Sequence, residues 1–209
     1  VRVDPIDVQE RLAGLAGLDA ATLEAAIGFG VGYRNECTLN DPIIAPGFLC
    51  WEKIIRGLRD RHPRWKRERE RNFELTVDPE GRIAIAVIAG NSLTGHPDRS
   101  PATARPRGKV TQEVLDQRQK NFLHLVPEEP DPHVEAPIWV VLYHIDVAAG
   151  EWRAELSQPT GMTKDGEVRG WRERIILPRI NDRTVIRIGD EVDDDHAPDV
   201  DVFVERLAN

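Results

Sequence analysis

The segment from Gly90 to Glu113 contains the residue types of an anion-binding site. It reads GNSLTGHPDRSPATARPRGKVTQE and joins a predicted buried strand to a predicted helix. Backbone N–H groups at a helix N-terminus attract anions. The candidate anion-binding residues at this helix start are Arg105, Arg107, Lys109 and Thr111. Two interpretations stay open: a loop that holds phosphate, chiefly through Arg107 and Lys109, or a long solvated connection.

A second group of chemically active side chains lies in the segment YHIDVAAGEWRAEL. Alternate side chains of a strand share a face, so His144 and Asp146 project together. If Asp146 pairs with Glu151, then His144 faces Arg153, and Glu155 joins the same face. The candidate catalytic residues are therefore His144, Asp146 and Glu155, which could bind a divalent metal or transfer protons. The alternative is a structural cluster in which Arg153 pairs with the carboxylates. The sequence identifies neither a metal nor a cofactor.

Two stretches of opposite charge form a third feature. The basic stretch RGLRDRHPRWKRERER covers Arg56–Arg71, and the acidic stretch GDEVDDDHAPDVD covers Gly189–Asp201. These charges either lie on solvated faces or attract one another; the alternative is that the basic stretch forms a face for nucleic acid. The acidic stretch with His196 could hold calcium or magnesium, but its spacing differs from the twelve-residue calcium loop, which favours a solvated acidic loop.

Several familiar motifs do not fit the chain. The nucleotide-binding loop fails because Thr111 comes one position late after Gly108-Lys109 and the earlier glycine is missing. Cys37 and Cys50 are too few for a four-thiolate zinc site or a disulfide framework. A nuclease of the restriction-enzyme type would need an acid-x-Lys pair on a strand, and RIAIAVIAG offers none.

The apolar pattern predicts three helices in the N-terminal third. Leucines at spacing three indicate a first helix, and Asp19 caps a second, which ends at the glycines 28, 30 and 32. A third helix begins near Gly47 and stops at Pro63. Farther along the chain, Thr111 is expected to cap a helix over residues 112–125.

Strand patterns dominate the rest of the chain. NFELTVDPEGRIAIAVIAG predicts a β-hairpin, and IWVVLYHIDV and EWRAELSQP predict an antiparallel pair. Further strands are expected at Arg172–Leu177, Arg183–Ile188 and Val200–Val204. This order predicts an α+β fold with a largely antiparallel sheet, on which the N-terminal helices and a central helix pack. We expect a single domain over residues 1–209, with a minor boundary near 126–137.

Composition narrows the classes of protein. The chain has 209 residues, 40% hydrophobic and 31% charged, with a net charge of -8 at pH 7. The negative charge argues against a protein that coats DNA non-specifically. The longest apolar run, Ile83–Ala89, is far shorter than a membrane span, so we expect no membrane partner and a cytoplasmic location.

Four segments together resemble uncharacterised proteins encoded in high-GC bacterial genomes. They are GFLCWEKIIRGLRDR, NFELTVDPEGRIAIAV, EWRAELSQP and RGWRERIILPRI, and the resemblance covers Tyr33–Pro178. It implies a bacterial origin and carries no activity.

Three functions follow as hypotheses. The first is a non-enzymatic binding module for an anionic ligand or nucleic acid, which contacts it through Arg56–Arg71 and the Gly90–Lys109 loop. The second is a metal-dependent hydrolase of the phosphoester type at the strand pair. The third is a subunit or inhibitor that binds a protein partner through the acidic stretch.

Overall fold

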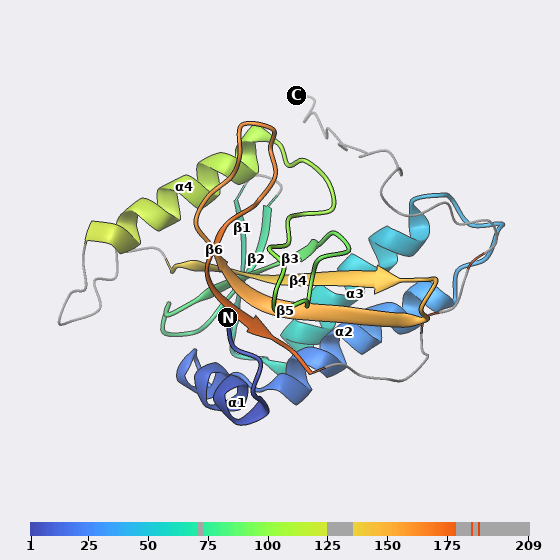
Figure 1. Ribbon diagram of the computed structural model, residues 1–209, viewed down its shortest axis with the longest axis horizontal. Helices are drawn as coiled ribbons and strands as arrows, with labels where there is room; N and C mark the ends of the chain where they lie inside the picture. The colour runs from blue at the N-terminus through green and yellow to red at the C-terminus, as the bar shows by residue number, and fades with distance from the viewer. Residues whose placement is uncertain (71–72, 125–135, 179–184, 186–187, 189–209) are drawn as a thin grey trace, which may run out of the picture.

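The computed structural model describes residues 1–70, 73–124, 136–178, 185 and 188, which form helices and one mixed sheet (Figure 1). The helices are α1 (Pro5–Gly14), α2 (Ala20–Asn35), α3 (Ala45–Arg61) and α4 (Lys109–His124). The strands are β1 (Lys66–Glu70), β2 (Phe73–Val77), β3 (Ala84–Ala89), β4 (Ile138–Asp146), β5 (Glu151–Pro159) and β6 (Trp171–Ile176). No helix of the described residues is long and apolar enough to cross a membrane.

The six strands lie side by side in chain order, from β1 at one edge to β6 at the other. All neighbouring pairs are antiparallel except β3 and β4, which are parallel. A parallel pair requires a crossover, and here residues 90–108 and α4 make it. The predicted α+β class with a largely antiparallel sheet is confirmed. Strand β3, before residues 126–137, pairs directly with β4, which follows them.

The N-terminal helices confirm one predicted cap and correct one predicted end. The Asp19 carboxylate accepts a hydrogen bond from the Thr22 N–H at 2.7 Å, so Asp19 caps α2 as expected. The helix was expected to end at the glycines, yet it continues to Asn35. Gly30 instead lies against α3, where a Cβ would come within 2.5 Å of the Cys50 carbonyl oxygen. The missing side chain allows two helices to approach closely, which is a different use of glycine from a helix stop.

Strand β1 was not expected from the sequence. Its residues, KRERE, belong to the basic stretch Arg56–Arg71, for which the sequence predicts solvated charges or a basic face and no strand. Each of them nevertheless pairs with a residue of β2, from Lys66 opposite Val77 to Glu70 opposite Phe73. A charged strand at the edge of a sheet also opposes pairing with other chains.

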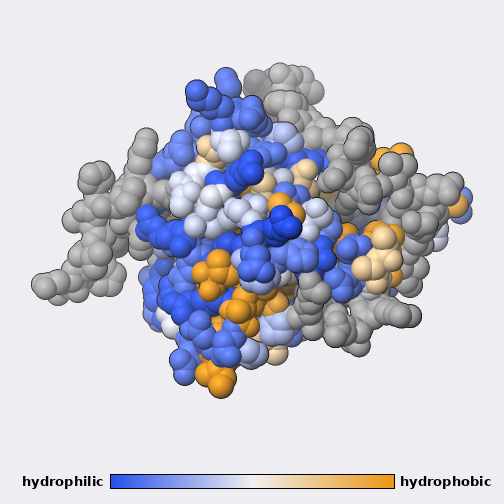
Figure 2. All heavy atoms as spheres, in the orientation of Figure 1, coloured by the Kyte–Doolittle hydropathy of each residue, from blue (hydrophilic) through white to orange (hydrophobic). Residues whose placement is uncertain are grey.

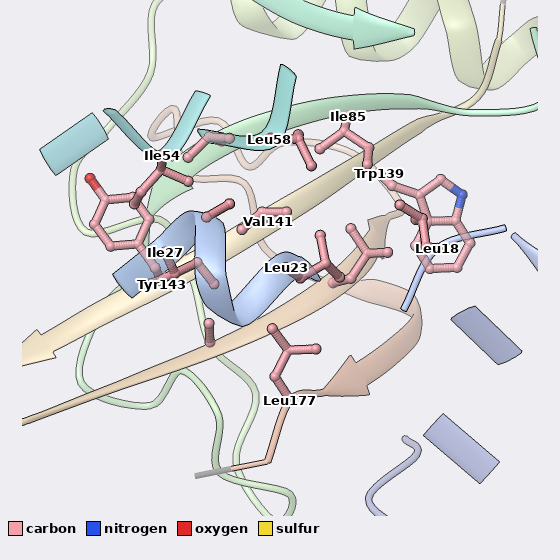
Figure 3. Packing of buried hydrophobic residues seen from close by; sticks show 14 of the residues in the cluster. Leu18, Leu23, Ile27, Ile54, Leu58, Ile85, Trp139, Val141, Tyr143 and Leu177 are labelled. Atoms are coloured by element: carbon pink, nitrogen blue, oxygen red, sulfur yellow. The ribbon is translucent and has the colours of Figure 1, made fainter. Parts of the chain in front are cut away.

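The first hydrophobic core lies between one face of the sheet and α1, α2 and α3. Figure 3 shows Leu23 and Ile27 of α2 and Ile54 and Leu58 of α3 pointing toward Val141 of β4. The Trp51 indole N–H of α3 also donates to the Val87 carbonyl of β3 at 3.0 Å. The three helices therefore cover one face of the sheet.

A second core lies on the opposite face. Leu75 and Val77 of β2 and Leu142 of β4 pack there with Val114 and Leu115 of α4. The packing positions predicted at Val114 and Leu115 are confirmed as buried.

The start of α4 differs from the prediction. The helix begins at Lys109, two residues before Thr111, so Thr111 lies in its first turn and is not its cap. The N–H groups of Thr111 and Gln112 both donate to the Gly108 carbonyl. The hydroxyl of threonine is suited to a cap, but Thr111 is part of the helix and is largely buried.

The N-terminal residues close the β6 edge. The Arg2 N–H donates to the Arg174 carbonyl at 2.8 Å, and the Ile176 N–H donates to the Arg2 carbonyl at 3.0 Å. The Glu173 carboxylate binds the guanidinium of Arg2 at 2.7 Å and that of Arg11, in α1, through two hydrogen bonds of 2.8 Å. Hydrogen bonds from Arg11 and Arg2 hold the pKa of Glu173 below its usual value, although burial opposes this shift.

Some predicted segments lie outside the described residues. They include the strand Val200–Val204, the acidic stretch Gly189–Asp201 and, apart from Val185 and Ile188, the strand Arg183–Ile188. Leu125, the last residue of the predicted helix, also lies outside the described residues.

The contact between α2 and α3 predicts the effect of Gly30→Ala. The new Cβ would meet both the Cys50 carbonyl and Ile54 Cγ1 at 2.5 Å, so the two helices must separate. We expect a loss of about 1–3 kcal/mol in the free energy of unfolding, measured by urea denaturation. Gly28→Ala is the control, because no atom lies within 4 Å of its Cβ. That variant should be unchanged or gain up to about 1 kcal/mol, and equal losses in both would contradict the close contact.

The lowered pKa of Glu173 predicts a pH-dependent contribution to stability. Because the folded-state pKa lies below the unfolded value of about 4.3, the contribution is present above that pH and is lost as the pH falls through the folded pKa. The free energy of unfolding of Glu173→Gln should therefore be lower than that of the wild type at neutral pH. The difference between the two values should become smaller as the pH falls. Denaturation at a series of pH values measures it, with Glu10→Gln on the exposed side of α1 as control. A gap that is constant with pH would contradict the ion pairs.

Candidate functional site

The loop of residues 90–108 lies on the face of the sheet that carries the predicted site on β4 and β5. Its first residue, Gly90, directly follows β3, and the Gly90 N–H donates to the Tyr143 carbonyl of β4 at 2.7 Å. Figure 1 shows the loop crossing β4 and β5 before it enters α4. The Gly95 N–H confirms the contact, since it donates to the Glu155 carboxylate at 3.0 Å. The two loci predicted separately from the sequence thus meet in space.

Glu155 is the centre of this contact. Its side chain is fully buried, and each carboxylate oxygen accepts two hydrogen bonds. Oε1 accepts from Arg174 Nε at 2.9 Å and from the Ser157 hydroxyl at 2.8 Å. Oε2 accepts from Arg174 Nη2 at 2.5 Å and from the Gly95 N–H. The charge is therefore paired and solvated by protein donors, as a buried carboxylate requires.

Two arginines hold the loop through its backbone carbonyls. Arg174 donates to the carbonyls of Arg99 at 2.5 Å and His96 at 3.1 Å. Arg153 donates to the carbonyls of Thr94 at 3.2 Å and Ser92 at 3.1 Å. Irregular backbone needs such partners wherever it is shielded from water.

A glycine permits the close approach of the loop to β5. Gly95 has a φ of +75°, and a Cβ at this position would lie 2.9 Å from the Arg153 Cβ. Both the backbone conformation and the space favour a residue without a side chain. The loop can therefore lie flat enough for its N–H to reach Glu155.

The predicted strand register is confirmed. Asp146 pairs with Glu151, His144 with Arg153, and Leu142 with Glu155. The candidate catalytic residues His144, Asp146 and Glu155 accordingly lie on one face.

Their partners differ, however. His144 Nδ1 lies 3.1 Å from the Gly90 carbonyl oxygen, and Asp146 accepts the Ala149 N–H of the following turn at 2.9 Å. Arg153 Nη1 lies 3.2 Å from Glu151 and 3.8 Å from Asp146. In the described part of the chain, no three His, Cys, Asp or Glu side chains are grouped to hold a metal ion. The observed contacts match those expected of a structural cluster, and a catalytic role for the three residues stays a prediction.

Arg174 is a functional member of this cluster that the sequence did not indicate. It lies opposite Ser157 in the β5–β6 pair and points to the same face as Glu155. A signal existed, because a carboxylate predicted inside an apolar strand pair needs a cationic partner. Which residue is that partner could not be predicted without knowing the register of β6.

The predicted anion-binding residues lie at the far end of the loop. The Arg107 N–H donates to the Gly166 carbonyl at 2.6 Å, so this segment lies beside the connection between β5 and β6. Arg105 is half-buried, Lys109 is exposed, and Thr111 is largely buried. Anion binding by these four residues stays a prediction.

A surface of basic side chains lies at the end of α3 and on β1. We call it the basic surface, and its exposed members are Arg61, Arg64, Lys66, Arg67 and Arg69. Pro63 ends the helix, and the chain turns directly into the edge strand. Within the described residues, Arg64 and Lys66 form no ion pair. Their charges are therefore available to a ligand.

One carboxylate faces several of these cations. Glu74 of β2 lies 3.0 Å from Arg59, 3.2 Å from Arg67 and 3.8 Å from Arg69. Burial raises the pKa of Glu74, but hydrogen bonds from Arg59 and Arg67 lower it by more, so the pKa lies below its usual value. Glu74 is thus ionised at neutral pH, and positive charge still exceeds negative charge here.

The two basic segments lie on opposite sides of the sheet. Glu74 and Thr76 contact Arg59 of α3, whereas Leu75 and Val77 belong to the second core with α4. Arg67 and Arg69 share the side of Glu74. The loop that carries Arg105 and Arg107 lies on the α4 side, so the two segments do not form one flat surface.

The chain matches no protein-family model, no curated protein and no solved structure. The resemblance to proteins of high-GC bacteria stays a prediction, and the function must be inferred from the site itself.

The contacts of Glu155 predict that it fastens the loop. Glu155→Gln would leave the buried Arg174 without a counter-charge, and we expect a loss of about 3–5 kcal/mol in the free energy of unfolding. The Gly95 amide should also lose protection in hydrogen exchange. Glu151→Gln is the control, because Glu151 is part-exposed and its pairing with Arg153 should contribute less than about 1 kcal/mol. Full protection of Gly95 in Glu155→Gln would contradict this role.

Proposed function

We propose that the protein is a non-enzymatic binding protein that contacts nucleic acid through the basic surface. The observation that carries the proposal is the set of five exposed basic side chains on the end of α3 and β1. Phosphate binding depends on such cations, whatever the nucleotide sequence.

The edge position of β1 suits a linear polyanion. On its inner side the strand pairs with β2, and its other side borders no strand of the described sheet. Arg67 and Arg69, opposite Thr76 and Glu74, project to one side of β1 and lie two residues or about 6.6 Å apart along the extended backbone, whereas Lys66, opposite Val77, projects to the other side. Two cations at this spacing can meet successive phosphates of one strand.

An aromatic ring lies among these cations. Trp65 is half-buried, and its ring lies beside that of His62, with the centroids 4.7 Å apart and the ring planes tilted by 33°. Burial lowers the pKa of His62, although Asp19 opposes the shift, so the imidazole is neutral at pH 7 and adds no charge. Aromatic side chains beside basic ones can stack on unpaired bases. This arrangement favours single-stranded over double-stranded nucleic acid.

The charge of the whole chain limits the expected affinity. With a net charge of -8, the protein repels a polyanion at long range, and attraction is confined to the basic surface. We expect weak binding, with a Kd on the order of 10⁻⁴ to 10⁻⁶ M at physiological salt.

The proposal is tested by titrating single- and double-stranded DNA and RNA across a salt series. Wild-type protein should bind single strands at low salt, with a Kd that rises steeply as salt is added. The double variant Arg64→Ala/Lys66→Ala should lower the slope of log K against log salt by about 1.4, the equivalent of two phosphate contacts on a single strand.

The control removes the same charge elsewhere. Lys164 and Arg169 are exposed in the connection between β5 and β6, so Lys164→Ala/Arg169→Ala should bind like the wild type. A second variant, Arg107→Ala/Lys109→Ala, tests the other basic segment. Binding that is absent at low salt, or that is lost in this second variant and retained in the first, would refute the proposed surface.

A further inference from the structure

An exposed apolar patch lies at the other end of α3. We call it the apolar tip, and its members are Leu39, Ile43, Ile44 and Phe48, which are 77%, 81%, 42% and 56% exposed. They lie in the connection from α2 and in the first turn of α3. Figure 2 shows hydrophobic surface at the right-hand edge, where Figure 1 places this connection. Single exposed apolar side chains are ordinary on a surface, but four large ones within ten residues of one connection and helix start are characteristic of an interaction site.

The residue at the start of α3 is unfavourable for the helix. Ile44 occupies the N-cap, and no side chain caps the first N–H groups. Ser, Thr, Asp or Asn at this position would stabilise the helix, and each would also be better solvated. An isoleucine here therefore contributes neither to the helix nor to the core.

The connection presents these side chains on an ordered backbone. The Asp41 carboxylate accepts the Thr38 N–H at 2.7 Å and the Thr38 hydroxyl at 3.0 Å. The Ala45 N–H donates to the Pro42 carbonyl at 2.8 Å. A preorganised patch loses less conformational entropy on binding than a flexible one.

Charge around the tip selects the partner. Residues 36–48 include the exposed acids Glu36 and Asp41 and no basic residue. Lys53, the next basic residue along the chain, pairs with Glu52 at 2.8 Å and lies over the Tyr33 ring. A second copy of this chain would bring its own acids against Glu36 and Asp41, and an anionic membrane would be repelled as well.

From the exposed apolar side chains and their acidic rim, we infer that the apolar tip docks a protein partner with an apolar patch rimmed by Lys or Arg. The basic surface lies at the opposite end of α3, and 17 residues of helix span about 25 Å. The two surfaces can therefore be occupied together, and docking at the tip does not depend on nucleic-acid binding.

Two synthetic peptides test the inference directly. Each is an amphipathic helix of about 18 residues, or five turns, with the same leucine face and with either Lys or Glu at every polar position. Fluorescence anisotropy at about 0.15 M salt measures binding to the full chain. The wild type should bind the Lys peptide at least about tenfold more tightly than the Glu peptide, and Ile43→Ser/Phe48→Ser should weaken binding of the Lys peptide about tenfold.

Two further variants separate the tip from general charge attraction. Val3 and Ile6 are exposed apolar residues near α1, so Val3→Ser/Ile6→Ser should bind like the wild type. Glu36→Lys/Asp41→Lys should shift the preference toward the Glu peptide. No binding of the Lys peptide, or equal binding by the Ile43/Phe48 variant, would overturn the inference. So would a dimer or an association with anionic vesicles that this variant abolishes.

Discussion

The buried ion pair between Glu155 and Arg174 is the interaction on which the crossover loop depends. A chain that leaves β3 and returns to a parallel β4 must cross the sheet, and residues 90–108 do so largely without regular structure. Their carbonyls would be unsatisfied against the sheet, and Arg174 and Arg153 supply the donors. Burying a guanidinium is costly unless an anion compensates it, and Glu155 does so for Arg174. The polar cluster on β5 and β6 thus holds the loop in place.

The sequence predicted this cluster well where the constraint was local. The tight turn after Asp146 leaves little freedom in how β4 and β5 pair, and the register assumed from the sequence, with Asp146 opposite Glu151, is the observed one. The partner strand β6 lies beyond a longer connection, and its register could not be deduced. Arg174, on which Glu155 depends, therefore remained unseen.

The failures of prediction have a common physical cause, which is packing between distant segments. Gly30 resembled a helix stop, yet contact with Cys50 of α3 gives it a packing role inside α2. The residues of β1 have no apolar face, and their pairing with β2 decides their conformation. Thr111 has the hydroxyl of a cap, but α4 starts two residues before it and the residue is largely buried. In each case tertiary contacts override a local preference.

Helix α3 organises the surface chemistry of the molecule. Its middle packs into the first core, its last turn leads into the basic surface, and its first turn belongs to the apolar tip. The proposed functions use side chains that the fold leaves exposed. The polar side chains of the strand pair, in contrast, form hydrogen bonds and ion pairs within the protein. A protein that brings nucleic acid and a protein partner together needs two separated surfaces on one rigid support, and α3 offers that arrangement.

The most direct test of this account is an amide chemical-shift titration of the folded protein with a short single-stranded oligonucleotide. The account predicts shift changes concentrated at residues 61–69, with the amide of Gly95, which is fastened to Glu155, unchanged. Shift changes confined to residues 105–111, or to His144 and its strand neighbours, would contradict it.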